Sequence, residues 1–339
     1  MKTRYWLVVA SALAACRVEL GAPRGRSGGD DEPAEVWVYT SMYREVVTAL
    51  EPILARELPR VRVRFFQAGS EKVRSRLEAE LAAGSSRCDV LAISDPGAYA
   101  TLKERGELLV RVPPAALSSP RSLLDLDGAY SLARVSMMVI GWSPRAARGT
   151  RPPAGFEDLA RSDLAGRITM GDPLSSGTAF SSVALLADRL GWGWFDRLKR
   201  SRLTVSGGNA AVLTRLETRE AAAGILLYEN LVVARRKGSP VEAIFPIEGP
   251  VLIPGHIAIL KGTRSPLAAA QVEDALLGRE AQAVLVKSGQ HGADPTAEPP
   301  EGAPRLDQLL DRSIHWQSAR AEASIDDAGL RERWARVMR

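Results

Sequence analysis

From residue 35 onward, short apolar runs alternate with segments in which apolar residues recur at helical spacing. The segments 35–57, 61–84 and 88–106 each predict a β-strand, a small polar turn and an amphipathic helix. The same form recurs in 166–191, 203–220 and 222–238, where the last strand is expected to end near Tyr228. This alternation predicts an α/β fold with largely parallel sheets.

Small polar and aromatic residues occupy the turns that follow these strands. Open α/β sheets bind ligands beyond the carboxyl ends of their strands, and a helix that begins there presents unpaired N–H groups to an anion. These turns therefore predict the following ligand-binding residues: Ser41, Tyr43, Ser70, Ser94, Asp95, Ser175, Gly177, Thr178, Asn209, Tyr228 and Glu229.

Several of these residues have more than one interpretation. Ser175, Ser176 and Thr178 in GDPLSSGTAF (171–180) are expected either to cap a helix alone or to cap it and bind ligand. Tyr228 is expected either to line the binding cleft or to pack on a neighbouring residue. Glu229 is expected either to accept a hydrogen bond from a sugar hydroxyl or ammonium group, or to be a solvated loop charge.

The remaining segments extend the same pattern. Ser70 is the expected N-cap of a helix that ends at Gly84. In the tail, Leu330, Trp334 and Val337 share one face of a last helix, with Ser324 or Asp326 as its expected cap. The three histidines show no metal-ligand spacing, and His256 is interpreted as structural.

The N-terminus predicts export. Lys2 and Arg4 precede an apolar stretch that is too short to span a bilayer, which is typical of a signal peptide over residues 1–15. Residues 13–16, Leu-Ala-Ala-Cys, resemble a bacterial lipobox with Cys16 as the lipidated residue, although an ordinary signal peptide remains the alternative. Residues 16–34 are rich in Gly, Pro and charge and predict a flexible tether.

Composition limits the function classes. The formal charge is +5, but arginines are scattered along amphipathic stretches and aromatic residues make up only 6%, which argues against nucleic-acid binding. The basic balance still favours anionic ligands. The chain has two cysteines, so removal of the signal peptide leaves Cys88 without a disulfide partner if Cys16 is lipidated, and Cys88 is expected in the core.

From about Glu35 to Arg339, the chain resembles the periplasmic solute-binding proteins of ABC importers, in their two-lobed type II class. The similarity is to binders of ferric ion, hexose phosphate and phosphonate. It is carried by the order and spacing of VYTSMYREV (38–46), GSEKVRSRLEAEL (69–81), CDVLAISDPGAYATLKERGELL (88–109), GDPLSSGTAF (171–180), GGNAAVLTRL (207–216) and IPGHIAILKGTRSPLAA (253–269).

The resemblance implies two lobes that close on a ligand in the cleft between them, each a mainly parallel sheet flanked by helices. Lobe 1 would comprise residues 35–138 and 250–339, and lobe 2 residues 139–249. It also implies a monomer in the periplasm, anchored to the membrane by lipid, that uses no cofactor and delivers a small molecule to ABC permease subunits. An arginine near the hinge, Arg134, would clamp a phosphate through two hydrogen bonds, with a surface arginine as the alternative.

The ligand has two candidate chemistries. The serine-rich turns favour a small anionic solute of the organophosphate or phosphonate type. Ferric iron is the alternative, with Tyr43, Asp95, Tyr228 and Glu229 as oxygen ligands. However, Tyr43 stands where the ferric-ion binders have His, Ser94 where they have Glu, and Tyr228-Glu229 where they have Tyr-Tyr.

Other classes of function have less support. The sequence contains no nucleophile elbow, zinc-protease motif, P-loop or dinucleotide-binding motif, so we do not expect an enzyme. A ligand-sensing module for a membrane receptor would have the same sequence features and stays open.

Overall fold

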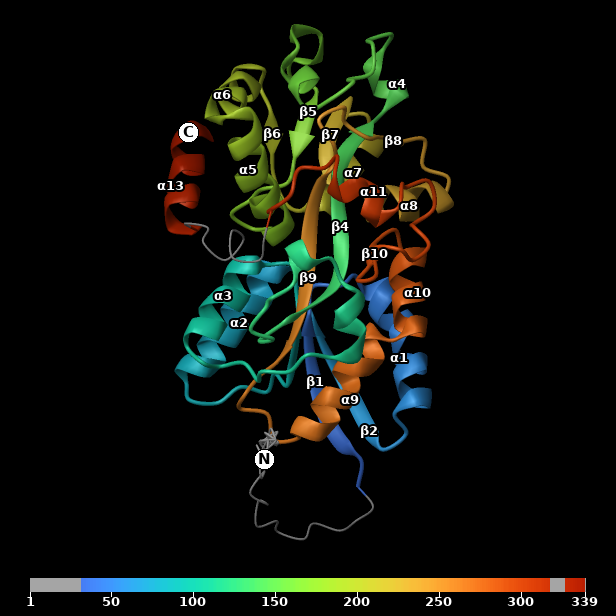
Figure 1. Ribbon diagram of the computed structural model, residues 1–339. Coiled ribbons are helices and arrows are strands. Elements are labelled where there is room, and N and C mark those ends of the chain that lie inside the picture. The colour runs from blue at the N-terminus through green and yellow to red at the C-terminus, as the bar shows by residue number, and fades with distance from the viewer. Residues whose placement is uncertain (1–31, 318–326, 339) are drawn as a thin grey trace, which may run out of the picture. The chain divides into compact units, whose positions relative to one another are not determined.

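The computed structural model describes residues 32–317 and 327–338 (Figure 1). Its strands are β1 Ala34–Thr40, β2 Val61–Gln67, β3 Val90–Ala92, β4 Ser131–Trp142, β5 Ile168–Met170, β6 Thr204–Val205, β7 Ala223–Leu227, β8 Glu242–Ile244, β9 Val251–Ile259 and β10 His291–Gly292. Its α-helices are α1 Arg44–Glu57, α2 Ser70–Ala82, α3 Pro96–Glu104, α4 Pro144–Ala147, α5 Gly177–Leu190, α6 Trp192–Arg200, α7 Asn209–Glu217, α8 Tyr228–Arg236, α9 Pro266–Leu277, α10 Arg279–Lys287, α11 Leu306–Leu310 and α13 Asp327–Met338. Short 3-10 helices cover Pro114–Ser118, Arg121–Leu123, Glu157–Ala160 and Ser162–Leu164.

Eight of the ten strands in the described residues follow one path, in the order β2-β1-β3-β9-β4-β7-β5-β6, while β8 and β10 pair with β4 beside it. The expected parallel pairing holds for β1 with β2 and β3, and for β5 with β6 and β7. The two long central strands, β4 and β9, run antiparallel to their neighbours. The sequence pattern, which predicted mainly parallel sheets, did not indicate these antiparallel strands. The first part of β4 pairs with β9 and its last part with β7, so β4 connects the two parallel groups.

Successive side chains of a strand point to opposite faces of the sheet. Alternating residues of β1 and of β4 therefore pack into hydrophobic cores on the two faces. Val36 and Val38 pack with the helices α1, α9 and α10, whereas Tyr39 faces α2 and α3. On β4, Met138 and Ile140 pack with α5 and α6, while Met137 and Val139 pack with α7 and α8. Helices therefore cover both faces, and the fold is α/β as predicted.

The last helix, α13, packs against α6. The ring centroids of Trp334 and Phe195 lie 5.4 Å apart, and Leu330 and Val337 join the same core, which confirms the predicted apolar face. The contact brings the end of the chain to a segment expected in lobe 2, although 250–339 was assigned to lobe 1. The lobe boundaries stay a prediction.

Two expectations about individual residues have different outcomes. Cys88 is 2% exposed and lies in the core, as predicted. Ser70 is not the N-cap of its helix, because Gly69 takes that position and Ser70 is the first helical residue. The helix does end before Gly84, whose φ of 86° favours glycine.

The predicted signal peptide 1–15, the lipobox 13–16 with Cys16, the tether 16–34 up to residue 31, and the candidate caps Ser324 and Asp326 lie outside the described residues. Among the residues that the structure describes, no helix is long and apolar enough to span a bilayer.

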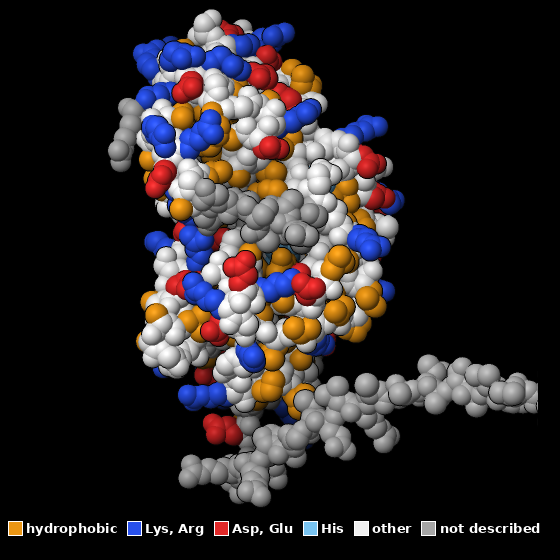
Figure 2. Space-filling view, turned by 60° about the vertical axis from the view of Figure 1, so that its left-hand side comes forward, with side chains coloured by type: hydrophobic (Ala, Val, Ile, Leu, Met, Phe, Trp, Pro, Cys, Tyr) orange, Lys and Arg blue, Asp and Glu red, His pale blue; other side chains and the backbone are white. Residues whose placement is uncertain are grey.

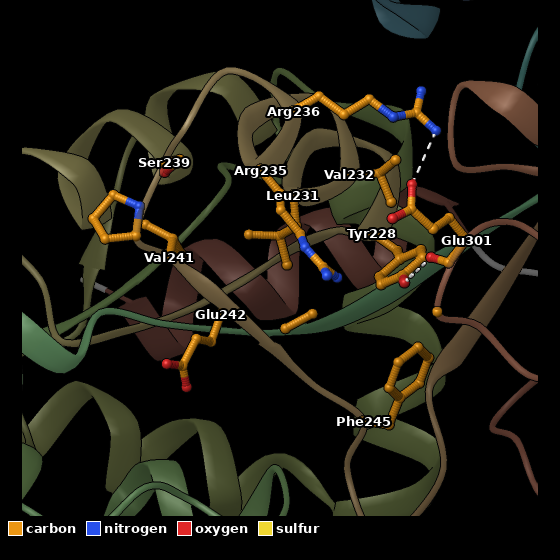
Figure 3. Close-up of a pocket in the computed structure, with 13 residues that line it drawn as sticks. Tyr228, Leu231, Val232, Arg235, Arg236, Ser239, Val241, Glu242, Phe245 and Glu301 are labelled. Atoms are coloured by element: carbon orange, nitrogen blue, oxygen red, sulfur yellow. Dashed lines mark hydrogen bonds and ion pairs between the residues drawn. The ribbon is translucent and has the colours of Figure 1, made fainter.

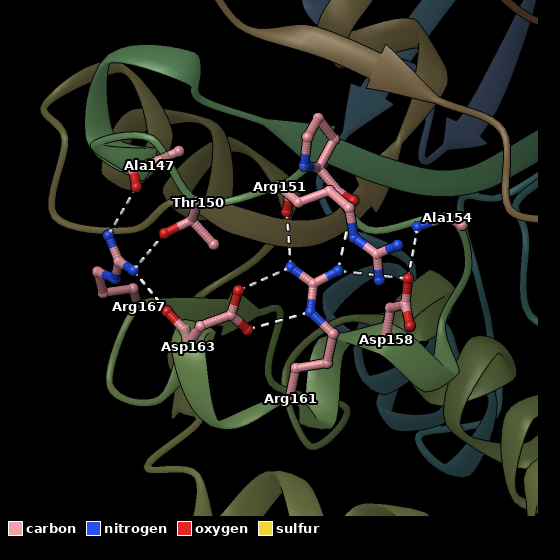
Figure 4. Close-up of polar contacts among 9 residues, drawn as sticks. Ala147, Thr150, Arg151, Ala154, Asp158, Arg161, Asp163 and Arg167 are labelled. Atoms are coloured by element: carbon pink, nitrogen blue, oxygen red, sulfur yellow. Dashed lines mark hydrogen bonds and ion pairs between the residues drawn. The ribbon is translucent and has the colours of Figure 1, made fainter.

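Several arginine side chains at the surface are engaged with the protein itself. Lys and Arg gather at the upper end of the face shown in Figure 2, with Asp and Glu among them. Arg161 pairs with Asp158 and Asp163 and donates to the carbonyl of Arg151, while Arg167 donates to the carbonyl of Ala147 (Figure 4). These contacts tie surface loops together.

Candidate functional site

A cavity of about 200 Å³ lies where the ends of several strands meet the starts of the helices that follow them. Ten of the twelve predicted site residues line it: Ser41, Tyr43, Ser70, Ser94, Arg134, Ser175, Gly177, Thr178, Asn209 and Glu229. They come from both segments that were expected to form separate lobes. The structure therefore brings together side chains that are up to 188 positions apart in the sequence.

Two predicted residues do not line this cavity. Asp95 caps α3 by accepting a hydrogen bond from the Ala98 N–H, and its other oxygen is 3.5 Å from Arg74. Tyr228 lines a different, larger pocket of about 520 Å³ beside β8, where its hydroxyl donates to the carbonyl of Glu301 (Figure 3). Its ring packs on Phe245, which agrees with the interpretation of Tyr228 as a packing residue.

Arg134 lies inside β4 and is 2% exposed, so it is not a surface arginine. Its Nη2 donates to the hydroxyls of Ser41 at 3.1 Å and Ser94 at 3.2 Å. Among the residues that the structure describes, its Nε and Nη1 have no hydrogen-bond partner. Burial lowers the pKa of this guanidinium, but arginine stays charged in proteins, so the cavity contains a cation with unused donors.

Gly255 on β9 makes room for this arginine. A Cβ atom at Gly255 would lie 2.8 Å from Cγ of Arg134, 2.9 Å from its Cζ and 2.9 Å from Oγ of Ser94. The guanidinium of Arg134 and the hydroxyl of Ser94 therefore lie directly over the backbone of Gly255, which has no side chain.

Glu229, the second residue of α8, is 2% exposed. Its Oε1 accepts hydrogen bonds from Ser136 Oγ at 3.0 Å and from Gln290 Nε2 at 2.9 Å, whereas Oε2 has no partner. Burial raises the pKa of this carboxyl, and the hydrogen bonds and Arg134 oppose that shift. The cavity thus holds a buried carboxyl group as well as a buried guanidinium.

Five helices begin at the cavity wall. The N-cap residues of α1, α2, α5, α7 and α8 are Tyr43, Gly69, Ser176, Gly208 and Leu227, and all five line the cavity. Only the Ser176 side chain among them caps its own helix, by accepting from the Ala179 N–H at 3.4 Å. The first turns of the other four lack a side-chain cap, and their N–H groups and dipoles favour negative charge in the cavity.

The serine-rich turn caps a helix and also lines the cavity. Ser176 caps α5, while Ser175, Gly177 and Thr178 line the cavity. Thr178 Oγ1 accepts a hydrogen bond from Asn209 Nδ2 at 3.0 Å, which connects the starts of α5 and α7.

Two contacts at the cavity link residues from the 35–138 segment with residues from the 139–249 segment. Gly177 approaches Ser70, and the Tyr43 hydroxyl donates to Asn230 Oδ1 at 3.0 Å. Burial, followed by the charge of Glu229, raises the pKa of Tyr43, so its phenol is protonated at neutral pH.

Three further polar residues line the cavity but were not considered for the site from the sequence: Gln67, Ser136 and Gln290. Ser136 follows Arg134 by two positions on one strand, and this spacing places both on the same face. Gln290 has no comparable signal, because it comes from a loop after α10 that only the fold brings to Glu229.

The proposed iron ligands are not all brought together. Tyr43 and Glu229 line the cavity, whereas Asp95 and Tyr228 do not. In the described part of the chain, no three His, Cys, Asp or Glu residues are grouped in a way that could hold a metal ion.

Residues 35–290 match the family described as bacterial extracellular solute-binding protein, and the chain belongs to this family. This family consists of solute-binding proteins rather than enzymes.

Two curated relatives match part of the chain. An uncharacterized protein of Haemophilus influenzae is 32% identical over 143 residues, which are 40% of this chain and 41% of the relative. The phosphoglycerate transport regulatory protein PgtC of Salmonella typhimurium is 27% identical over 233 residues, or 65% of this chain and 57% of the relative. The chain thus matches about two fifths to somewhat over half of the length of these relatives.

Solved structures of periplasmic binding proteins share the fold. The periplasmic binding protein P5PA has a TM-score of 0.78 at 20% identity, covering 90% of this chain and 100% of its own. AfuA from Actinobacillus pleuropneumoniae, with fructose-6-phosphate bound, has a TM-score of 0.78 at 22% identity, covering 90% and 98%. Iron-bound HitA from Pseudomonas aeruginosa has a TM-score of 0.77 at 17% identity, covering 90% and 99%.

Proposed function

We propose that this solute-binding protein captures a small anionic solute of the organophosphate or phosphonate type by lobe closure and delivers it to an ABC permease. The observation that carries the proposal is the buried guanidinium of Arg134, whose Nε and Nη1 have no partner at a cavity where five helices begin. A buried cation with unused donors is costly unless a ligand satisfies it, and a phosphate or phosphonate oxygen does so with a charge-assisted hydrogen bond.

The size of the cavity and the comparisons support this class of solute. A volume of about 200 Å³ lies below the roughly 300–1,000 Å³ of drug-sized ligand pockets, so the solute is small. The name of PgtC refers to phosphoglycerate, and AfuA was solved with fructose-6-phosphate. Both are phosphorylated small molecules, in agreement with an anion held by Arg134.

Ferric iron is the weaker candidate. HitA holds iron on the same fold, but only Tyr43 and Glu229 of the four proposed ligands line the cavity here. A buried arginine beside them would repel a trivalent cation. Iron binding would need an additional anion to offset that charge.

The test is calorimetric titration of the purified protein with glycerol 3-phosphate, a hexose phosphate, a phosphonate and ferric citrate. We expect binding of at least one phosphorylated or phosphonate compound, and loss of that binding by about 10- to 100-fold in Arg134→Met, since hydrogen bonds to charged groups contribute about 1.5–3 kcal/mol. The matched control is Arg145→Met, at an exposed position on α4, which should bind like the wild type. Binding of iron alone, or equal affinities in both variants, would contradict the proposal.

Delivery to a permease and the lipid anchor on Cys16 are parts of the same proposal. A sensing module would use the same cavity, so the two roles differ only in the membrane partner. Genes for a permease and an ATPase adjacent to the gene for this chain would support transport, as would loss of solute uptake on deletion of the chain.

A further inference from the structure

We infer that the site has a second pole, formed by Glu229 and Gln290, which binds a hydrogen-bond-donating group of the same solute. The solute would therefore be a phosphate or phosphonate that also bears a hydroxyl or ammonium group, rather than a simple anion. This inference rests on the proposed function, because it assumes that Arg134 holds the anionic group.

Two acceptor atoms at this pole lack partners. Glu229 Oε2 and Gln290 Oε1 are buried and have no hydrogen-bond partner within residues 32–317 and 327–338, although both residues line the cavity. The remaining polar atoms of the two side chains form a hydrogen bond with each other, in which Gln290 Nε2 donates to Glu229 Oε1 at 2.9 Å. This bond also settles the orientation of the amide: its nitrogen must face the carboxylate, so its oxygen is the free atom.

An anion alone would not satisfy these atoms. Fully ionised phosphate, phosphonate and carboxylate groups supply only further acceptors, which can pair with Arg134 but not with a carboxylate oxygen or an amide oxygen. Buried acceptors that stay unpaired in the closed complex weaken binding. Hydroxyl and ammonium groups are donors, and each satisfies the second pole without adding a like charge.

The two poles are adjacent. Ser136, which donates to Glu229, follows Arg134 by two positions on β4. The Cα atoms of Arg134 and Ser136 are therefore about 7 Å apart, and both side chains lie on one face of the strand. The small cavity allows no long linker between the two groups. We therefore expect the hydroxyl or ammonium group of the solute to lie only two or three bonds from its phosphate or phosphonate group.

The experiment uses three probes with one skeleton: ethyl phosphate, 2-hydroxyethyl phosphate and 2-aminoethyl phosphate. Their dissociation constants are measured by calorimetry on the purified wild type, Glu229→Gln, Gln290→Met and the exposed control Glu242→Gln. We expect the wild type and Glu242→Gln to bind a donor-bearing probe at least 10-fold more tightly than ethyl phosphate. We expect Gln290→Met to reduce this preference several-fold.

Glu229→Gln distinguishes the two donor chemistries. An amide oxygen still accepts from a hydroxyl, so a preference for the hydroxyethyl probe should fall only a few-fold in this variant. A preference for the aminoethyl probe should fall by more than 10-fold, because the variant removes the charge that pairs with ammonium. Melting curves confirm folding, and Gln290→Met keeps the test valid if Glu229→Gln does not fold.

Equal affinities of the wild type for all three probes would overturn the inference while leaving anion binding intact. A preference that both variants retain in full would also overturn it, because the donor group would then bind elsewhere. If none of the probes or the phosphorylated compounds above binds, the proposed function fails and this inference fails with it.

Discussion

Gly177 and Ser70 meet so closely that a Cβ atom placed on Gly177 would lie 2.9 Å from the Cβ of Ser70. The backbone oxygen of Ser94 would be 3.2 Å away, so the new atom could not avoid both contacts by a change of rotamer. Gly177 begins α5 and Ser70 begins α2. The start of one helix is thus packed directly on the start of the other at the wall of the cavity.

This contact predicts that Gly177→Ala hinders closure. Overpacking of this kind costs about 1–3 kcal/mol, so ligand affinity should fall by roughly 5- to 150-fold if the lobes must open to relieve the clash. Calorimetry measures the affinity, and small-angle scattering of the ligand-bound protein should show a larger radius of gyration than for the wild type. Gly193→Ala on α6, where a Cβ has open space, is the control and should leave both quantities unchanged.

The packing of Arg134 over Gly255 makes a second prediction. In Gly255→Ala the new methyl group occupies space taken by the guanidinium and by Ser94, so Arg134 must leave its position. We expect loss of solute binding comparable to that of Arg134→Met, with a folded protein in circular dichroism. Gly262→Ala, which meets nothing within 4 Å, should bind normally. Wild-type affinity in Gly255→Ala would show that the solute does not depend on this placement of Arg134.

The serine-rich turn separates into a stabilising residue and residues expected to bind solute. Ser176→Ala removes the cap of α5 and should lower the free energy of unfolding by about 1 kcal/mol. The double variant Ser175→Ala, Thr178→Ala should instead weaken solute binding by roughly 1–3 kcal/mol through lost buried hydrogen bonds. Urea unfolding and calorimetry on both variants test this division. Unchanged affinity in a folded double variant would remove Ser175 and Thr178 from the site.

His291 predicts a loss of stability in acid. Its side chain is 3% exposed, its Nε2 has no hydrogen-bond partner, and burial lowers its pKa from 6.5 to about 4. Between these values the unfolded chain takes up a proton that the folded protein does not, so stability is present above pH 6.5 and is lost as the pH falls toward 4. The shift corresponds to roughly 3 kcal/mol at most.

The variant His291→Gln should lose less stability than the wild type between pH 7.5 and pH 4, by about 2–3 kcal/mol. Other titrating groups, including His256 and Glu273, contribute equally to the pH dependence of both proteins. The measured quantity is therefore the difference between wild type and variant in the free energy of unfolding lost from pH 7.5 to pH 4. Urea unfolding at both pH values gives the four free energies. An identical loss in both proteins would mean that His291 takes up its proton in the folded state.

Much of the site followed from local patterns. Residues at the ends of parallel strands lie at one edge of a sheet, so Ser41, Ser94 and Asn209 could be assigned to a common site before their contacts were known. Arg134 was assigned as a phosphate clamp, but its burial inside β4 and the unpaired donors came only from the structure. The sequence alone left a surface arginine as the alternative.

Neighbouring residues at a helix start show where local patterns fail. Tyr228 and Glu229 were both expected at the site, but successive residues of a helix point about 100° apart. Glu229 faces the cavity, whereas Tyr228 faces the pocket beside β8. Which of the two faces inward depends on how α8 packs against β4 and α7, and no local pattern contains that rotation.

The amino-acid sequence by itself determined the α/β class, the order of the elements and the turns that carry polar residues, because hydrophobic period, caps and turn residues act over a few positions. Only the tertiary structure decided which turns meet: Gln290 reaches Glu229, and Gly255 leaves space for Arg134, across 61 and 121 positions of the chain. Such contacts depend on the pairing of β4 with β9 and β7, and the energy of that pairing is a property of the folded chain as a whole. Tertiary contacts of this kind therefore determine which polar groups line the cavity, and these groups determine which solute can bind.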